Sequence, residues 1–500
     1  MKPREIFITI AIVIIALTQG ISLLWKPILW SFIITGPLIL VGINDIFNKK
    51  NAIKNNFPVI GHLRYLLESF RPEIQQYFVE TDIEGTPINR EFRSLIYQRA
   101  KNTTDTTPFG TKRDVYQVGY EWMNHSIYAK SAEELDKDPR VLVGGKSCKQ
   151  PYNASLLNIS AMSFGALSQN AVLAMNKGAK MGGFAQNTGE GSISPYHLEN
   201  GGDLIWQVGT GYFGCRTHDG NFNPETFAKR SQLPSVKMIE LKLSQGAKPG
   251  HGGILPAVKN TEEIAKIRDV EPFKAVHSPP YHKAFSDAEG LLNLIQKMRD
   301  LSGEKPIGFK LCVGSKTEFE DICKAMVKTQ ILPDFITVDG GEGGTGAAPI
   351  EFSNSLGMPL REGLHLVNSL LLKYEFRNDI KLIASGKILT AFHMARTFAL
   401  GADLCNSARA MMMAVGCIQA LQCNTNTCPV GVATQNKSLM KGLNVEDKAT
   451  RVKNFHEKTI GAFQELLAAT ALTSASDITK KHIQRRVSTT EVKTYEEIYL

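Results

Sequence analysis

Short apolar runs alternate with amphipathic stretches through the middle of this 500-residue chain, and this alternation constrains the fold more than any other feature. The apolar runs predict buried strands, and amphipathic stretches of about 10–15 residues predict the helices between them. Eight such units within about 250 residues predict a closed (β/α)8 TIM barrel of the α/β class, rather than an open doubly wound sheet. The eight predicted strands are Leu156–Ser160, Gly183–Gln186, Met238–Leu243, Ala275–His277, Ile307–Val313, Phe335–Val338, Lys381–Ala384 and Ala402–Asn406.

Helical patterns lie between most of these strands. The second and third units fit the repeat worst, because residues 187–235 would form a long excursion there. The predicted helices are Asn170–Met181, Glu262–Arg268, Asp287–Leu301, Glu318–Thr329, Leu360–Tyr374 and Thr390–Leu400.

The N-terminus carries two uncharged apolar runs, Ile6–Leu24 and Ile28–Ile43. A helix needs about 20 apolar residues to cross a bilayer, so the first run is long enough and the second, which contains Pro37, is marginal. Basic residues precede the first run and follow the second, and only Lys26 lies between them. The positive-inside rule therefore predicts a transmembrane hairpin over residues 1–48 of an inner (cytoplasmic) membrane protein, with both ends and the remaining chain in the cytoplasm. A single anchor and a cleaved signal peptide are the alternatives.

Composition narrows the remaining organisation. A hydrophobic content of 43% with 21% charged residues excludes a disordered chain and allows a large core. The net charge of +9 is spread without long blocks, which disfavours nucleic acid as a partner.

We expect four segments: the hairpin at 1–48, an α-rich N-terminal subdomain at 49–150, the barrel with a cysteine-rich loop at 151–440, and a helical C-terminal tail at 441–500.

The loops after the seventh and eighth predicted strands are candidates for phosphate binding, since such barrels carry their chemistry at the carboxyl ends of the strands. Gly386 would let the backbone approach an anion closely, and Lys387 and Arg409 would add positive charge. This combination predicts a phosphorylated substrate or FMN, although glycines can also merely turn the chain.

Gly209–Gly214 matches a GxGxxG pattern, but the loop-like residues after it argue against a dinucleotide fold.

Three of the eight cysteines lie within twelve residues, at Cys417, Cys423 and Cys428, with Pro429 directly after the last. Cysteines this sparse overall indicate a reducing compartment rather than a disulfide scaffold. Thiolates in one tight loop followed by proline suit an iron–sulfur cluster, and three of them suit a three-iron cluster. A zinc site completed by Asp or His and three buried structural cysteines are the alternatives.

Several separated stretches are distinctive together: Ser160–Ser163, Asn187–Gly191, Lys242–Gly250, Ser278–Pro280, Gly343–Gly346 and Cys417–Gln435. Through them, residues of about 155–440 resemble the FMN-binding central domain of glutamate synthase large chains, here in a short, membrane-anchored form. The resemblance implies a 3Fe–4S cluster on Cys417, Cys423 and Cys428. It implies FMN binding by Ala161, Met162, Ser163, Gln207, Lys242, Gly340, Gly341, Gly344, Gly386, Lys387, Ser407, Ala408 and Arg409.

The same resemblance implies catalytic positions. Lys242 would sit near the flavin pyrimidine edge, where its charge favours the anionic reduced flavin. Glu190, Gln245 and Lys259 would face 2-oxoglutarate or 2-iminoglutarate, with Lys259 pairing a substrate carboxylate. Glu190 could instead cap a helix, and Lys259 could be a solvated surface lysine.

The chain also departs from that family. No cysteine precedes Cys148, so we expect no catalytic N-terminal cysteine of a glutaminase. We expect ammonia itself or a separate amidotransferase to supply nitrogen, and ferredoxin or a separate reductase to supply electrons, because no NADPH or FAD fingerprint is present. His251 stands where the large chains usually carry an acidic residue, and Tyr212 where they carry a basic one.

These features predict an FMN- and iron–sulfur-dependent oxidoreductase that reduces 2-iminoglutarate, formed from 2-oxoglutarate and ammonia, to glutamate. The first alternative is a flavoenzyme on the same barrel that acts on another amine or imine. The second is a membrane-docked electron-transfer module without turnover of its own, since a fold does not by itself fix a function.

Overall fold

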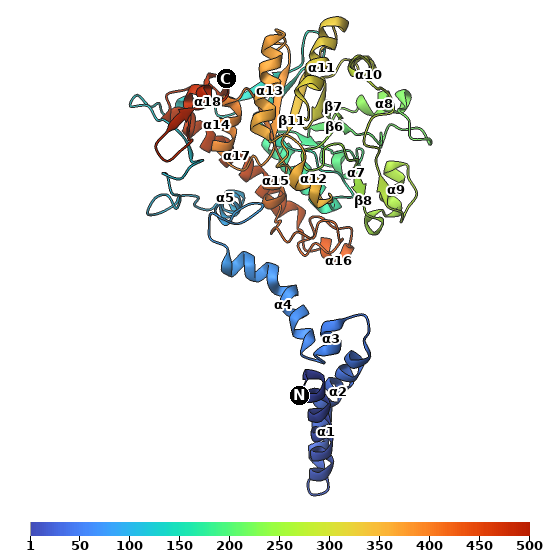
Figure 1. The fold of residues 1–500 in the computed structure, drawn as a ribbon. Helices are drawn as coiled ribbons and strands as arrows, with labels where there is room; N and C mark the ends of the chain where they lie inside the picture. The colour runs from blue at the N-terminus through green and yellow to red at the C-terminus, as the bar shows by residue number, and fades with distance from the viewer. Residues whose placement is uncertain (1) are drawn as a thin grey trace. The chain divides into compact units, whose positions relative to one another are not determined.

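The computed structural model describes residues 2–500, and the chain divides into two compact units, residues 1–90 and 91–500, each of which is described here by itself (Figure 1). The first unit is helical. Its elements are α1 (Pro3–Ser22), the 3-10 helix η1 (Lys26–Ser31), α2 (Phe32–Phe47), α3 (Ala52–Asn56), α4 (Gly61–Ile74) and the π-helical turn η2 (Gln75–Val79).

Two helical stretches of this first unit, Pro3–Ser22 and Lys26–Phe47, are long and apolar enough to cross a membrane by length and composition. Most of their large apolar side chains are exposed, among them Ile12, Leu17 and Ile34. The end of α2 is tied to the start of α4 through Asp45, which accepts hydrogen bonds from the Val59 amide at 3.0 Å and from His62 Nε2 at 2.9 Å.

The second unit is built on a closed barrel of eight parallel strands, which confirms the predicted fold class (Figure 1). Nearly every strand position is buried, as expected for parallel strands covered on their outer face by helices. In barrel order the strands are β4 (Leu157–Ile159), β5 (Gln186–Asn187), β6 (Leu204–Val208), β7 (Val236–Lys242), β10 (Ile307–Leu311), β11 (Phe335–Asp339), β12 (Lys381–Ser385) and β13 (Leu404–Ser407).

Two predicted strand assignments were wrong at the unit that fitted the repeat worst. The third barrel strand is β6, Leu204–Val208, which lies inside the region expected to be an excursion. Ala275–His277 does not join the barrel: β9 (Val276–His277) pairs antiparallel with β8 (Ile254–Leu255) in a separate two-stranded sheet. The run at Met238–Leu243 therefore corresponds to the fourth strand, β7, rather than the third.

Several of the helices that cover the barrel begin at residues whose side chains accept a hydrogen bond from the first turn. Ser168 caps α6, Thr261 caps α9, Asp287 caps α10 and Thr390 caps α14, so each strand-to-helix loop ends in a defined helix start. The helices of this unit are α5 (Arg90–Lys101), α6 (Gln169–Gly182), α7 (Pro195–Leu198), α8 (Pro224–Ser231), α9 (Glu262–Arg268), α10 (Ala288–Leu301), α11 (Lys316–Thr329), α12 (Ile350–Ser355), α13 (Leu360–Lys373), α14 (Ala391–Ala399), α15 (Arg409–Ala414), α16 (Lys437–Met440), α17 (Val445–Ala469) and α18 (Tyr495–Ile498).

Segments outside the repeat pack against the amino-terminal end and the side of the barrel. The hairpin of β2 (Arg140–Val143) and β3 (Tyr152–Ser155) is joined to the start of β11, because the Gly145 amide donates to Asp334 Oδ1 at 2.7 Å. The last 60 residues contain the long helix α17 together with strands β14 (Ile483–Arg486) and β15 (Val492–Thr494), which form a sheet with β1 (Glu121–Met123). The chemistry-bearing loops are thereby left at the opposite, carboxyl end of the strands.

Candidate functional site

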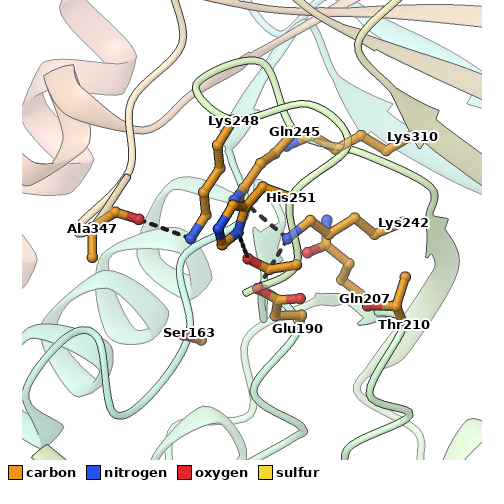
Figure 2. Close-up of polar contacts among 12 residues, drawn as sticks. Ser163, Glu190, Gln207, Thr210, Lys242, Gln245, Lys248, His251, Lys310 and Ala347 are labelled. Atoms are coloured by element: carbon orange, nitrogen blue, oxygen red, sulfur yellow. Dashed lines mark hydrogen bonds and ion pairs between the residues drawn. The ribbon is translucent and has the colours of Figure 1, made fainter. Parts of the chain in front are cut away.

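A buried ion pair forms the centre of the candidate site at the carboxyl end of the strands. Lys242 is the last residue of β7, and its Nζ lies 2.9 Å from Glu190 Oε1, on the loop that follows β5. Gln245 Oε1 accepts a hydrogen bond from the same Nζ at 3.2 Å. Figure 2 shows Lys242 between these two side chains. The structure thus brings together three of the four residues predicted to be catalytic.

Two further cations act on Glu190. Burial alone would raise its pKa, but Lys242, followed by Arg268 and Lys248, more than offsets this and holds the pKa below its ordinary value. Burial lowers the pKa of Lys248 to about 8 and that of Arg268 to about 10. The site therefore holds a permanent carboxylate surrounded by an excess of positive charge, which favours an anionic ligand.

Arg268, at the end of α9, is a site residue that the sequence analysis missed. Its Nη2 donates to the Phe164 carbonyl at 2.9 Å, and its Nε is buried without a hydrogen-bond partner among the described residues. Arg268 and Glu190 line a cavity of about 30 Å³, whose other walls include Ser163 and Ile254. An unpaired guanidinium nitrogen at a cavity wall is the donor that a carboxylate ligand requires.

A second polar network lies beneath the ion pair, inside the barrel. Glu240 on β7 accepts hydrogen bonds from Asn187 at 2.8 Å, from Gln207 at 2.6 Å and from Thr337 at 2.6 Å. The predicted flavin ligand Gln207 therefore has its side-chain nitrogen committed to Glu240.

Lys310, which neighbours Lys242 in the β7–β10 register, lies 3.2 Å from Asp339 and extends this network. Burial alone would lower its pKa, but Asp339 and Glu240 raise it, so Lys310 stays charged. Glu240 was not recognised in the sequence, because it lies within an otherwise ordinary apolar strand.

The loops after β12 and β13 bring the predicted phosphate ligands together. Burial lowers the pKa of Lys387, and the nearby Arg409 lowers it further, while Glu342 acts in the opposite direction on both cations. Arg409 Nη2 donates to the Glu342 carbonyl at 3.3 Å, and its Nη1 is buried without a partner among the described residues. Gly386, directly before Lys387, has a φ of +152°.

The remaining predicted flavin residues surround the same strand ends. Ala161, Met162 and Ser163 are half-buried on the loop after β4, against Gly189 and Gly191. Gly340, Gly341 and Gly344 lie in the loop after β11, where Gly344 packs against the Arg409 guanidinium. Ser407 donates its hydroxyl to the Ile388 carbonyl at 2.6 Å, and Ala408 precedes α15.

The three clustered cysteines follow α15 on one loop. Cys428 is buried, whereas Cys417 and Cys423 are half-buried. Burial raises the pKa of Cys417 to about 11, and the three sulfurs act electrostatically on one another. Within residues 2–500, no three His, Cys, Asp or Glu side chains converge as a single metal ion requires. A cluster of several irons has a different requirement, because each thiolate binds its own iron.

Lys259 occupies a different place from the other predicted catalytic residues. It lies in a short 3-10 turn after β8, is 1% exposed, and donates from Nζ to the Ala166 carbonyl at 2.9 Å. The charged groups that act on it are Cys423 and Cys428. The structure therefore brings Lys259 to the cysteine loop.

Tyr212 and His251, the two departures noted in the sequence, have separate explanations. Tyr212 is fully buried and its hydroxyl lies 3.0 Å from His282 Nδ1, so it supports the loop around residue 282. His251 packs edge-on against Phe352, with ring centroids 5.2 Å apart.

A larger surface cavity of about 1220 Å³ lies between α10, α11 and residues 280–288, and its described lining includes none of the predicted site residues.

Comparison with known proteins places this geometry in context. Residues 99–473 match the family described as the conserved region in glutamate synthase. The glutamate synthase large subunit-like protein YerD of Bacillus subtilis (strain 168) is 38% identical over 496 residues, which cover 91% of this chain and 94% of that protein. The archaeal glutamate synthase (NADPH) of Methanocaldococcus jannaschii is 34% identical over 322 residues, 64% of this chain and 60% of that protein.

Among solved structures, the recombinant flavin-binding domain of baker's yeast flavocytochrome b2 aligns with a TM-score of 0.45 and 10% identity, over 92% of this chain and 96% of that one. So remote a likeness adds nothing to the barrel already evident from the strand order.

Proposed function

Because the chain belongs to the glutamate synthase family and is an oxidoreductase of that type, we propose that its barrel binds FMN and a 3Fe–4S cluster and reduces 2-iminoglutarate, formed from 2-oxoglutarate and ammonia, to glutamate. The observation that carries this proposal is the buried Glu190–Lys242 pair with Arg268 at the cavity wall. When bound, the two cofactors would supply electron entry and hydride delivery, which the side chains cannot provide.

The residues around the cavity carry the charges that the two ends of such a substrate require. The unpaired Nε of Arg268 would bind a substrate carboxylate, and Lys248 would add a second positive charge. Glu190, ionised and shielded from water, would orient the cationic nitrogen of the imine. Lys242, at the end of β7, would hold its ammonium beside the anionic form of the flavin.

The proposed phosphate site rests on two half-buried cations that lie close to each other. Lys387 and Arg409, with the free Nη1 of Arg409, fit a phosphate group at the ends of β12 and β13. Cys417, Cys423 and Cys428 fit a cluster because they lie on one loop and act on one another electrostatically.

The same proposal extends to the partners and to location. Ferredoxin or a separate reductase would deliver the electrons, and free ammonia or a separate amidotransferase would deliver nitrogen. The two apolar helices at Pro3–Ser22 and Lys26–Phe47 would anchor the chain in the cytoplasmic membrane, with the barrel on the cytoplasmic side.

The test uses detergent-purified full-length protein kept without oxygen. After reduction with dithionite, addition of 2-oxoglutarate and ammonium should restore the absorbance of oxidised flavin and release glutamate. A reduced flavin that stays reduced with both compounds present, in protein that contains FMN and iron, would exclude this substrate pair. Protein purified without flavin and iron would exclude the proposal as a whole.

An imine of a less polar 2-oxo acid is the second candidate. The observation that favours it is the apolar part of the cavity wall, which consists of Ile254, Leu255 and Val276. In the same experiment, flavin reoxidation by 2-oxobutyrate with ammonium, faster than by 2-oxoglutarate with ammonium, would select this candidate over the first.

A further inference from the structure

Lys259 is a buried cation in an unusual position. Its ammonium has one hydrogen bond, to the Ala166 carbonyl at 2.9 Å, and within residues 2–500 it forms no ion pair with a carboxylate. A buried ammonium that lacks an anion is strongly unfavourable, and proteins normally pair such a group. The environment of Lys259 is therefore incomplete unless an anion is close by.

The groups that can supply this anion are the cluster cysteines. Cys423 and Cys428 are the charged neighbours that act on Lys259, and the Val258 carbonyl beside it accepts a hydrogen bond from Asn426 of the cysteine loop at 3.3 Å. As thiols these cysteines are neutral, and the buried ammonium of Lys259 then has no negative group beside it among the described residues. As iron-bound thiolates they would carry the missing negative charge.

The same region also holds the loop that follows β4. Lys259 fixes this loop at Ala166, and Gln435, seven positions after Cys428, donates to the Gly165 carbonyl at 3.0 Å and the Leu167 carbonyl at 2.8 Å. Ser168 adds a bond from its hydroxyl to the Gly431 carbonyl at 2.7 Å. The loop carrying Ser163 and the cysteine loop are thus fastened together, with Lys259 on one side and Gln435 on the other.

We propose that Lys259 is the buried counter-cation of the iron–sulfur cluster: it neutralises the cluster held by Cys417, Cys423 and Cys428 and fixes the cluster loop against the loop that carries Ser163. This rests on the cluster of the proposed function and assigns Lys259 as a positioning residue rather than a ligand of the substrate carboxylate. A cation beside an electron-accepting group favours its reduced, more negative form.

The first test measures thermal stability with and without the cluster, using Lys259→Met in the full-length protein. Without iron, the substitution removes an unpaired buried charge and should leave the melting temperature unchanged or raised. With the cluster, it removes the counter-cation and should lower the melting temperature. A change of the same sign in both states would overturn the proposal.

Lys305→Met is the matched control. Lys305 is also buried, donates to two backbone carbonyls, of Ser231 at 2.7 Å and Leu233 at 3.0 Å, and burial likewise lowers its pKa to about 8. It precedes β10, at the end of the barrel opposite to the candidate site, so its substitution should have the same effect with and without the cluster.

The second test is a redox titration of the cluster followed by electron paramagnetic resonance. Lys259→Met should lower the midpoint potential enough to change the ratio of reduced to oxidised cluster about tenfold at a fixed potential, about 59 mV for a one-electron couple. Lys259→Arg keeps the charge and should bring the midpoint potential most of the way back to the wild-type value.

A midpoint potential unchanged in Lys259→Met, with the iron content of the wild type, would overturn the inference and leave the cluster itself in place. Wild-type protein without the cluster signal would overturn both this inference and the cluster in the proposed function.

Discussion

Glu190 is the residue on which the proposed chemistry depends most directly. Its carboxylate lies 2.9 Å from Lys242 Nζ and also lines the cavity with Arg268. We expect Glu190→Gln to lower kcat/KM for glutamate formation about 100-fold or more, because a neutral amide cannot stabilise a cationic imine nitrogen. Steady-state rates with an artificial electron donor measure this.

The control for that substitution is Glu446→Gln, which breaks an exposed ion pair with Lys177. Exposed pairs contribute little, so the rate and flavin content should match the wild type. A rate equal to wild type in Glu190→Gln would remove Glu190 from the mechanism.

Lys248 gives the site a pH dependence. Burial lowers its pKa to about 8 in the folded chain, so its positive charge is present below that pH and is lost as the pH rises through it. If the ammonium contributes about 1.4 kcal/mol to binding an anionic substrate, the KM for 2-oxoglutarate should rise about fivefold between about pH 7 and pH 9. Lys248→Arg, which stays charged throughout, should abolish this rise. A wild-type KM that stays flat over this range would contradict the prediction.

At this scale the sequence revealed groups that lie a few positions apart. Lys242 and Gln245 were predicted together, and their side chains meet because they lie three positions apart where β7 ends. Arg268, Glu240 and Lys310 were missed, since an arginine at the end of a helix or a charge within a strand has no local signature of burial. Their roles depend on which strands become neighbours.

At the scale of elements, two glycine loops touch across the carboxyl end of the barrel. A Cβ at Gly246, after β7, would lie 1.7 Å from the Gly340 carbonyl oxygen, after β11. We expect Gly246→Ala to force these loops apart, to weaken flavin binding at least about tenfold and to lower the melting temperature. Fluorescence titration with FMN and thermal unfolding measure the two effects.

Gly461→Ala is the matched control for that substitution. Gly461 lies within α17, and nothing stands within 4 Å of the Cβ it would gain. Its replacement should stabilise the chain by about 0.5–1 kcal/mol through helix propensity and leave FMN binding unchanged. Equal loss of FMN in both variants would contradict the close approach at Gly246.

Element assignment from the sequence succeeded where a strand and its helix were both strongly patterned. Helix α9 was predicted with its observed bounds, and β10 through β13 were located within a few residues. Strand β6 was missed because its five buried residues follow directly on Gly201–Asp203 and precede a glycine-rich turn, so that the segment reads as loop. The short apolar run at residues 275–277 was mistaken for its replacement, since local pattern does not distinguish a barrel strand from a strand in a small side sheet.

At the scale of the whole molecule, the two apolar helices set the expected location. We expect the full-length protein to remain in the membrane fraction after carbonate extraction, because the Pro3–Ser22 and Lys26–Phe47 helices expose most of their apolar side chains. A chain without residues 2–48 should move to the soluble fraction and retain flavin. Full-length protein released by carbonate would contradict the hairpin.

The number of strands and the barrel class were predictable from counting repeats over about 250 residues, because a closed parallel barrel requires strands and helices to alternate along the chain. The division of the chain near residue 90 was not predictable, because residues 49–150 show no strong period. We expected one subdomain over those residues, without a boundary near residue 90. The small sheet formed by β1, β14 and β15 joins segments more than 350 residues apart in the sequence, and no local sequence pattern predicts this pairing.

The β2–β3 hairpin is fastened to Asp334 at the amino end of β11, so the loops that carry the candidate site lie at the other end of the barrel. If the proposed function holds, oxo acid, ammonia and product would pass the same end of the barrel that an electron-carrying protein would cover when it docks near the cysteine loop. Catalysis and electron delivery would therefore alternate in time, and an excess of the carrier protein should slow turnover rather than saturate it.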